Sequence, residues 1–379
     1  MTLTGAAGDP LIHAIGWFDG RYGYNVMTRG LFDPLSHRLP VLASPIRGRT
    51  GPVEEDKAAI PRLFPDADRI TVTMLYGSMT RVMHDVDGPR ICFTLWESTR
   101  LPKGWAESLD RHTDRIWTAT PWGKRVFAAN GLDPDRIDVV PLGIDPALFH
   151  PDLPPTPAIA RDGIYTFLSV GRWEKRKGMA DLVKAFDDEF SDSDDVRLVL
   201  AGLHANQLDL DLGRELAPLG LRRPDRLKII PPVGRHTIFA GIYTACDAFV
   251  APTRAEGWGL PMTEAMACGL PTIVTGYSGP SAFIGEHAYR IDHRLVPVDV
   301  PFFETDDGDL GLWAEPDWRH LRHLMRHVYE NREEARARGM AGADHVRDRF
   351  SWDRAADRAA DLLRRVSGNT SVTGDAGGD

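Results

Sequence analysis

The 379-residue sequence contains little cysteine and no long apolar run. Cys92, Cys246 and Cys268 are widely spaced and odd in number, and no Cys-x-x-Cys pattern occurs. This usage argues against a disulfide framework and predicts buried thiols in a reducing compartment. No run is long enough to cross a bilayer, and the first ten residues lack a basic region followed by an apolar core. We therefore expect a cytoplasmic protein.

The sequence also lacks an excess of positive charge. Its 45 Lys and Arg residues stand against 54 Asp and Glu residues, which gives a formal net charge of −9. A general nucleic-acid binder relies on net positive potential, so no nucleic-acid partner is predicted. Membrane association is not indicated either, although a local basic patch leaves it open. The sequence does not determine the oligomeric state.

Two cofactor signatures are missing. No apolar run is followed by Gly-x-Gly-x-x-Gly with an acidic residue about 20 positions later. The absence of this motif argues against an NAD-dependent oxidoreductase, and we expect no cofactor. The His residues show no zinc-like spacing. The acidic runs Asp209-Leu-Asp211 and Asp306-Asp307-Gly-Asp309 end no predicted strand, so we interpret both as acidic loops and expect no metal site.

The sequence does contain two series of short apolar runs, in a chain long enough for two domains. The runs lie at 11–15, 70–75, 91–95, 116–118 and 137–140 and, after the Pro-rich segment 151–157, at 165–170, 196–201, 227–230, 248–250, 272–274 and 289–291. Helical candidates such as 179–190 and 237–245 separate several of them. This alternation predicts an α/β protein of two doubly wound, Rossmann-like domains facing across a cleft, at 1–152 and 163–345. A helix over 352–366 and a disordered tail over 367–379 complete the prediction.

The stretch from 251 to 285 combines a strand end, a glycine-bracketed loop and a short helix. Pro261 in the first turn and Gly269 just past the end are typical of helix boundaries. Such a loop lies at the carboxyl edge of a parallel sheet, where ligands bind, and the helix start offers unpaired amides to an anion. Glu256 and Glu264 suit vicinal hydroxyls, because a carboxylate only accepts and a diol donates twice. Alternatively, Glu264 merely complements the helix dipole.

The segment Glu256-Gly-Trp-Gly-Leu-Pro-Met-Thr-Glu264, followed by Ala-Met-Ala-Cys-Gly, closely resembles a family signature. It is the Glu-x7-Glu motif of the retaining, nucleotide-sugar-dependent glycosyltransferases of family 4, which have the GT-B fold. The resemblance implies that Glu256 faces the hydroxyls of the donor sugar and that Glu264 takes the ribose hydroxyls. The amides implied to approach the sugar and the diphosphate are those of Gly257, Trp258, Gly259 and Leu260.

Four cations follow the run at 165–170, between two glycines at 171 and 178. By itself such a charge run is interpreted as a solvated loop. However, Gly-Arg-x4-Lys-Gly resembles the other half of the family signature, in which the Arg and the Lys bind the donor diphosphate. The resemblance implies this role for Arg172 and Lys177 and leaves Lys175 and Arg176 as ordinary loop charges. Preplaced cations stabilise the charge that develops on a leaving diphosphate, so no metal is required.

Two segments of the first domain are similar to the family pattern but depart from it. Gly20 and Gly23 follow the first run and would let the backbone approach the donor phosphate, although the family's adjacent Gly-Gly is Gly20-Arg21 here. After the run at 91–95, many members have a His close to the reacting carbon. Trp96 or Glu97 occupies that position.

We assign this second segment to the acceptor. Trp96 would stack on a sugar face, and Glu97 would orient the acceptor hydroxyl or bind an amine, with Arg100 beside them. The alternatives are that Glu97 only pairs with Arg100, and that His84 replaces the missing His.

The sequence therefore predicts a metal-independent hexosyltransferase that moves a sugar from a nucleoside diphosphate sugar to an acceptor hydroxyl. Retention of the anomeric configuration is implied by the resemblance, and the acceptor is a glycan, a lipid-linked sugar or a small natural product. The predicted catalytic residues are Arg172, Lys177, Glu256 and Glu97. Two alternatives use the same diphosphate site: a GT-B sugar-nucleotide epimerase and a non-catalytic sugar-nucleotide-binding protein.

Overall fold

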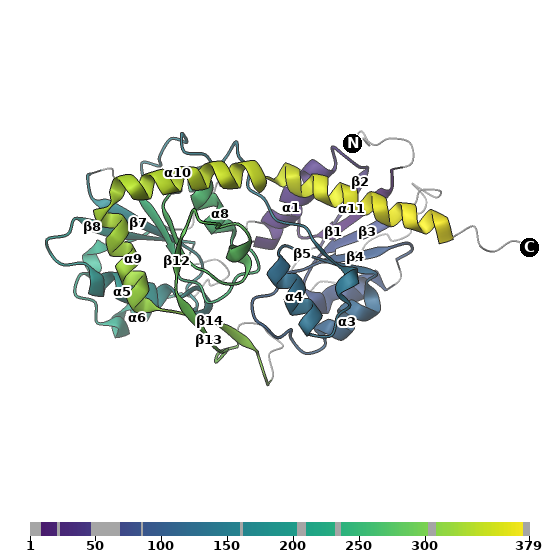
Figure 1. The fold of residues 1–379 in the computed structure, drawn as a ribbon, viewed down its shortest axis with the longest axis horizontal. Coiled ribbons are helices and arrows are strands. Elements are labelled where there is room, and N and C mark those ends of the chain that lie inside the picture. Colours follow the sequence, from purple (N-terminus) through teal and green to yellow (C-terminus); the bar gives the residue numbers. More distant parts are fainter. Residues whose placement is uncertain are drawn as a thin grey trace, which may run out of the picture. The chain divides into compact units, whose positions relative to one another are not determined.

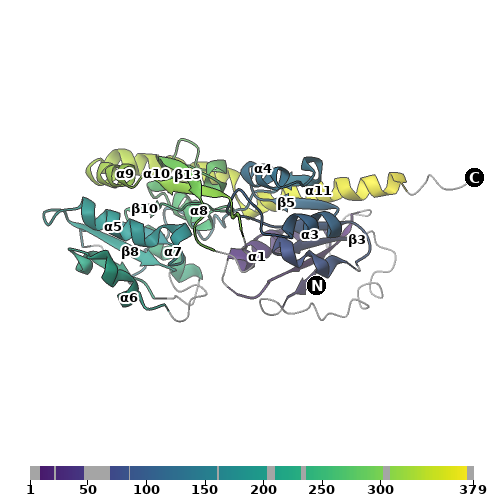
Figure 2. The same ribbon diagram turned by 90° about the horizontal axis from the view of Figure 1, so that it is seen from below.

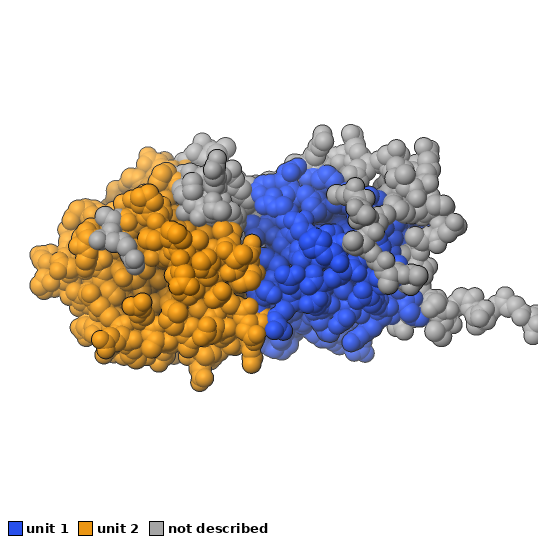
Figure 3. All heavy atoms as spheres, turned by 90° about the horizontal axis from the view of Figure 1, so that it is seen from above, with its two compact units in different colours: residues 1–96, 100–143, 350–379 blue, residues 97–99, 144–349 orange. Residues whose placement is uncertain are grey.

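A computed structural model describes residues 9–20, 23–46, 69–84, 86–159, 162–202, 210–231, 236–301 and 308–373 of the chain. Contacts divide the chain into two compact units, coloured apart in Figure 3. Unit 1 comprises residues 1–96, 100–143 and 350–379, and unit 2 comprises residues 97–99 and 144–349. The division after residue 143 falls earlier than the predicted boundary at 152. The Pro-rich segment 151–157 packs on unit 2, where the Thr156 amide donates to the Gly241 carbonyl at 2.9 Å.

Unit 1 contains a six-stranded parallel sheet in the order β2-β1-β3-β4-β5-β6. The strands are β1 Leu11–Gly16, β2 Val41–Pro45, β3 Arg69–Met74, β4 Arg90–Phe93, β5 Arg115–Thr118 and β6 Ile137–Val139. Its helices are α1 Gly23–Leu35, α3 Trp105–His112, α4 Pro121–Ala129 and α11 Trp352–Thr373, with 3-10 turns η1 Gly77–Met83 and η2 Pro134–Arg136. The five predicted strands are confirmed. The edge strand β2 was not predicted, because its apolar part, Val41 to Ala43, is short and lies between Pro40 and Pro45.

Unit 2 contains a second six-stranded parallel sheet in the order β12-β11-β10-β7-β8-β9. Of these strands, β7, β8 and β12 are labelled in Figure 1, and β8 and β10 in Figure 2. The strands are β7 Tyr165–Val170, β8 Val196–Ala201, β9 Leu227–Ile229, β10 Ala248–Ala251, β11 Thr272–Thr275 and β12 Tyr289–Ile291. All six were predicted. An antiparallel hairpin, β13 His293–Pro297 with β14 Leu312–Pro316, was missed because its exposed, polar first strand has no apolar pattern.

The helices of unit 2 pack in two groups. They are α5 Met179–Glu189, α6 Leu212–Leu216, α7 His236–Thr244, α8 Leu260–Ala267, α9 Trp318–Glu330 and α10 Arg332–Arg349, with short 3-10 turns η3 Lys175–Lys177, η4 Ala217–Leu219, η5 Pro224–Arg226 and η6 Gly279–Ala282. Helix α5 packs with α9, and α8 packs with α7 and α10. The chain leaves β7 toward one sheet edge and β10 toward the other, so right-handed crossovers place α5 and α8 on opposite faces.

The core of unit 2 lies between its sheet and the pair α5 and α9. Phe167 and Leu198 from the strands meet Phe186 and Phe190 at the end of α5, and Met325 covers them from α9. These side chains are at most 2% exposed. Strand β7 is buried along its whole length, which explains why its residues are mostly apolar, because a central parallel strand is covered on both faces.

Helix α11 belongs to unit 1 and packs against α1. The contact is close at Gly30, where an added Cβ would lie 2.4 Å from the Trp352 ring. The helix runs to Thr373, so our prediction that it ends at 366 and gives way to a disordered tail is wrong for residues 367–373. A helix that is already nucleated gains one hydrogen bond per added residue, so polar composition alone did not end it. Residues 374–379 lie outside the described part of the chain.

No helix among the described residues is both long and apolar enough to span a bilayer.

Candidate functional site

The strand order of unit 2 reverses between β7 and β10, and ligands bind open α/β sheets at such a point. The loops that follow these two strands touch each other. Gly178 has a φ of +68°, and an added Cβ there would lie 2.6 Å from the carbonyl oxygen of Pro252. The amide of Arg254 donates to the carbonyl of Arg176 at 2.7 Å. The fold therefore joins the two segments that the sequence singled out.

A buried carboxylate and two cations occupy this junction. Lys177 Nζ donates to Glu256 Oε1 at 2.6 Å, and Arg176 Nη1 donates to Glu256 Oε2 at 3.3 Å. The Glu256 residue is only 6% exposed. Burial pushes the pKa of its carboxyl up, but Lys177 and Arg176 outweigh burial and hold this pKa below its usual value. Glu256 is therefore an ionised acceptor inside the protein.

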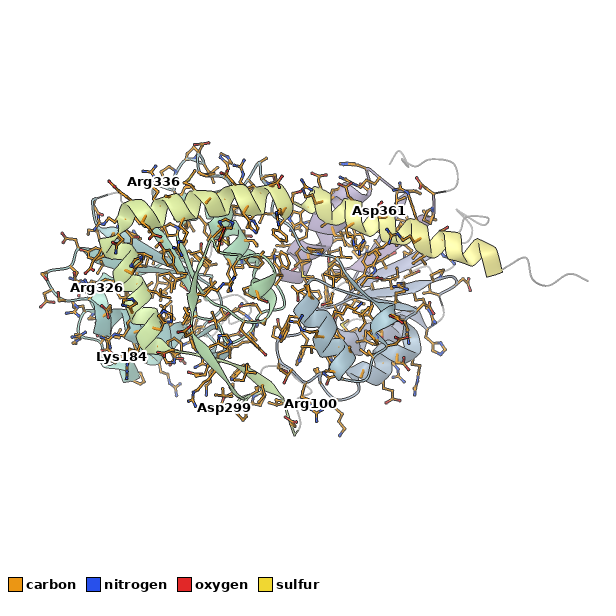
Figure 4. All side chains as sticks on the ribbon, in the orientation of Figure 1. Arg100, Lys184, Asp299, Arg326, Arg336 and Asp361 are labelled. Atoms are coloured by element: carbon orange, nitrogen blue, oxygen red, sulfur yellow. The ribbon has the colours of Figure 1, made fainter. Side chains whose placement is uncertain are left out.

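Our interpretation of Arg176 as an ordinary loop charge is wrong. This side chain is buried, and its Nη2 donates to Glu174 Oε1 at 2.8 Å while its Nη1 donates to the Ala255 carbonyl at 2.8 Å. The 3-10 turn η3 sends consecutive side chains about 120° apart, so Arg176 and Lys177 can both reach Glu256 while the third cation points outward. Lys175 does lie at the surface, where it pairs with Asp299, labelled in Figure 4.

Arg172 joins the cluster through Glu174. Its Nη2 lies 3.1 Å from Glu174 Oε2, while Arg176 holds the other oxygen of the same carboxylate. The Arg172 side chain is 35% exposed, so it keeps a face toward solvent that a ligand can reach.

The main chain of Glu256 is held by the loop after β11. The Glu256 amide donates to Ser278 Oγ at 2.9 Å, and the Gly279 amide donates to the Glu256 carbonyl at 2.9 Å. Both backbone polar groups of this residue are thereby satisfied by neighbouring residues of one loop.

Helix α8 begins directly after this loop. Gly259 precedes it with a φ of +113°, and Pro261 lies in its first turn, as predicted. In the described part of the chain, the amides of Gly257, Gly259 and Leu260 make no hydrogen bond. The N-terminus of α8 therefore offers donors, with the positive end of the helix dipole, to an anion. Trp258 does not face this opening, because its buried ring packs on Phe283.

Glu264 lies in a second, separate pair. Its Oε2 accepts a hydrogen bond from the Tyr243 hydroxyl at 2.6 Å, and both side chains are buried. Burial raises the pKa of Glu264 to about 7, and the Tyr243 hydroxyl opposes that rise. Among the described residues, no ion pair joins Glu264 to Lys177 or Arg172. The two carboxylates of the motif thus have different charge environments.

In unit 1, the strand order reverses between β1 and β3, and the glycine loop follows β1. Gly20 has a φ of +120°, and an added Cβ would lie 2.7 Å from Asn25 Oδ1. The Asn25 side chain donates to the carbonyls of Trp17 and Asp19, which ties the loop to the start of α1. Gly23 is the first residue of α1, with open space around its α-carbon. Residues 21 and 22 lie outside the described part of the chain.

The residues predicted to bind the acceptor differ in burial and belong to different units. Trp96 is 4% exposed, its ring packs on Trp105, and its Nε1 donates to the Arg100 carbonyl. A buried ring cannot stack on a sugar, so the structure contradicts that role for Trp96. Glu97 belongs to unit 2, with Oε1 4.0 Å from Arg176 Nη1. Arg100 belongs to unit 1 and is exposed (Figure 4). His84 packs beside His112.

The described residues hold no group of three or more His, Cys, Asp or Glu side chains arranged for a metal ion. Of the two acidic runs, Asp211 caps α6 by accepting from the Arg214 amide, while residues 209, 306 and 307 lie outside the described residues.

Four residues of the site were missed by sequence reasoning: Glu174, Arg176, Tyr243 and Ser278. Glu174 and Arg176 stand inside the recognised Gly-Arg-x4-Lys-Gly segment, where a carboxylate among four cations was a usable signal. No local signal marks Tyr243 or Ser278, since each meets its glutamate 21 or 22 residues away in sequence.

Comparisons with known proteins find relatives of this chain. Residues 158–296 match the family described as "Glycosyl transferases group 1". A D-inositol 3-phosphate glycosyltransferase of Xylanimonas cellulosilytica is 31% identical over 251 residues, which cover 62% of this chain and 53% of that protein. The Mycobacterium tuberculosis protein of the same name is 26% identical over 336 residues, which cover 85% of this chain and 60% of that one. The chain thus spans about half to three fifths of the length of these relatives.

Solved structures share the fold. Sucrose-phosphate synthase from Thermosynechococcus elongatus superposes with a TM-score of 0.69 at 17% identity and covers 95% of this chain and 100% of that one. Anabaena HepE in complex with UDP and glucose gives a TM-score of 0.67 at 16% identity, with coverage of 94% and 100%. The predicted two-sheet α/β architecture and the resemblance to GT-B glycosyltransferases are confirmed. This chain has the GT-B fold, and residues 158–296, which lie in unit 2, match the glycosyl transferases group 1 family.

Proposed function

We propose that this protein is a retaining, metal-independent glycosyltransferase of family 4. It moves a hexose from a uridine diphosphate sugar to a hydroxyl of a small polyol or glycan. The observation that carries the proposal is the Glu256–Lys177–Arg176 cluster at the reversal point of the unit 2 sheet, within the region that matches the family.

The choice of donor is supported by one structural relative, which holds UDP and glucose. Glu264 would take the two ribose hydroxyls, because an ionised carboxylate accepts both hydrogen bonds. The acceptor to test first is inositol 3-phosphate, since the curated relatives are named for it.

The chemistry follows from where charge develops. As the bond between the anomeric carbon and the phosphate oxygen breaks, negative charge grows on the leaving diphosphate. Arg172, Lys177 and the unbonded amides at the start of α8 are positive groups that favour the transition state over the ground state. Glu256 limits the freedom of Lys177, so the ammonium group is already in place when the charge appears.

Retention is proposed through attack on the face that the diphosphate leaves. The acceptor oxygen forms a bond to the anomeric carbon while the bond to phosphate breaks, and the acceptor proton passes to the departing phosphate oxygen. Glu97, close to Arg176, is proposed to orient the acceptor hydroxyl, with Arg100 nearby in sequence. Gly20 and Gly23 keep their proposed place beside the donor phosphate.

The test incubates the purified chain with UDP-glucose and inositol 3-phosphate in the presence of EDTA, with Lys177→Met as the variant. We expect an α-linked product by NMR from wild type, no effect of the chelator, and a large loss of rate for the variant. A β-linked product contradicts retention, and inhibition by EDTA contradicts metal independence.

Two other outcomes reject glycosyl transfer as the activity. Conversion of the donor sugar without acceptor identifies an epimerase. Tight UDP-glucose binding with no product across UDP-, GDP-, ADP- and dTDP-sugars and a panel of acceptors identifies a binding protein.

A further inference from the structure

Ser278 has a backbone conformation that normally requires glycine. Its φ is 56° and its ψ is −137°, and it is the one residue other than glycine with a positive φ in the described part of the chain. These angles are close to those of the first central position of a type II′ turn, where glycine is the usual residue because a Cβ is crowded there. Strained residues of this kind persist where the surrounding structure holds them, and they cluster at functional sites.

The Ser278 side chain offers a reason for keeping serine. Its Oγ accepts the hydrogen bond from the Glu256 amide at 2.9 Å, and the whole residue is buried. A glycine would relieve the strain but would leave that buried amide without this acceptor.

Gly279, the next residue, packs closely against the Glu256 backbone. Gly279 donates its amide to the Glu256 carbonyl at 2.9 Å, and an added Cβ would lie 2.7 Å from three backbone atoms, the Glu256 oxygen, the Gly257 carbon and the Trp258 nitrogen. The two backbones are therefore in direct contact. The turn at 278 and 279 leaves the main chain of Glu256 little freedom.

We infer that Ser278 is a positioning residue that fixes the Glu256 backbone, so that the Glu256 carboxylate stays on Lys177 and Arg176. The carboxylate is the shared acceptor of both cations, so a shift of its backbone displaces both partners together. The effect on sugar transfer rests on the proposed function, whereas the effect on Lys177 does not.

Two substitutions separate strain from positioning. Ser278→Gly removes both the strain and the hydroxyl, and Ser278→Ala removes only the hydroxyl. We expect kcat of Ser278→Gly to fall about 10- to 100-fold with KM for the donor within threefold, since small misplacements of catalytic groups cost rates of that order. Ser278→Ala should show the same loss of kcat with a lower Tm than Ser278→Gly, because alanine keeps the backbone strain that glycine relieves. Ser193→Gly, at an exposed serine after α5, should change neither quantity.

A second readout does not require activity. The rate at which an amine-specific acylating reagent modifies Lys177 is measured by mass spectrometry relative to Lys184, a half-exposed lysine on α5 labelled in Figure 4. In wild type, Lys177 is held by Glu256 and is 14% exposed, so it should react slowly. We expect the ratio of the two rates to rise at least threefold in Ser278→Gly and to stay constant in Ser193→Gly.

An unchanged ratio in Ser278→Gly overturns the inference, whatever the activity. A Tm for Ser278→Gly that is no higher than that of Ser278→Ala overturns the strain argument. If wild type transfers no sugar but the labelling ratio rises, the proposed function fails and the positioning role stands.

Discussion

Replacing Glu256 by Gln should lower the free energy of unfolding of unit 2 by about 3 kcal/mol. The Gln side-chain oxygen can still accept a hydrogen bond from Lys177. Because that oxygen carries no negative charge, the bond is weaker by about 1 kcal/mol. The Gln amide group would face the donor Nη1 of Arg176, so this second charge-assisted bond is lost, at a cost of about 2 kcal/mol. The sum agrees with the lower end of the roughly 3–5 kcal/mol found when one partner of a buried ion pair is removed.

Thermal unfolding followed by calorimetry measures this effect. For a unit of this size, each kcal/mol moves Tm by about 2–4 °C, so the unit 2 transition should fall by about 6–12 °C. The matched control is Glu330→Gln on α9, whose carboxylate is 59% exposed and lies 3.8 Å from Arg326. An exposed pair of this kind contributes at most about 1 kcal/mol, so the control should stay close to wild type. A fall in the Tm of unit 2 of less than about 2 °C for Glu256→Gln corresponds to less than about 1 kcal/mol and would falsify the proposed energetics.

The same pair determines a pH dependence. Although burial raises the pKa of Glu256, Lys177 and Arg176 hold it below the ordinary value of 4.5, so the folded state binds the proton less readily than the unfolded state. The stabilisation is therefore present above that value and is lost as the pH falls through the folded pKa. The difference in Tm between wild type and Glu256→Gln should narrow on acidification from pH 6 to pH 3. A difference that stays constant contradicts the charge assignment.

Further predictions concern the nucleotide, the leaving group and the backbone contact. Glu264→Ala should weaken UDP binding by about 10²–10⁴-fold in calorimetric titration, because up to two charge-assisted hydrogen bonds are lost; unchanged affinity in a folded variant refutes the ribose assignment. Since burial raises the pKa of Glu264 to about 7, UDP affinity should fall as the pH drops below that value. The Tyr243 hydroxyl lowers this pKa, so Tyr243→Phe should move the pH midpoint of UDP binding upward. A pH-independent Kd would argue against an ionised Glu264 as the acceptor. Arg172→Ala should lower kcat more than it raises KM in steady-state kinetics, and a pure KM effect rejects the leaving-group role. Gly279→Ala should lower the unfolding free energy by about 1–3 kcal/mol, because its Cβ meets backbone that cannot move aside; an unchanged Tm contradicts that contact.

Most of the architecture followed from the sequence alone. Eleven apolar runs were interpreted as strands and all are strands. Eight of them are central parallel strands, which are covered on both faces and so leave a strong local signal; the other three, β6, β9 and β12, lie at sheet edges. Elements with a weaker signal were missed, namely the edge strand β2, whose apolar part is short and lies between prolines, and the hairpin β13–β14. The bounds of α8 were also readable, since Pro in the first turn and Gly past the end are local rules.

The sequence also located the segments of the candidate site, through motifs at 172–177 and 256–264, but not the partners of each side chain. It predicted Arg176 as a surface charge, whereas the tertiary structure buries it against Glu256, 80 residues away. It likewise gave Glu264 no partner, and the fold supplies Tyr243.

What the sequence by itself determined, therefore, were the strands, the helix boundaries and the motif positions, since each depends on neighbours within a few residues. Only the tertiary structure decided which cations of η3 reach the buried Glu256 and which carboxylate is ionised among cations rather than buried beside a hydroxyl. It also decided that a serine with glycine-like backbone angles supports Glu256. Those outcomes depend on burial and on contacts between distant segments, and the free energy of an ion pair or a pKa is determined by what surrounds the group in space.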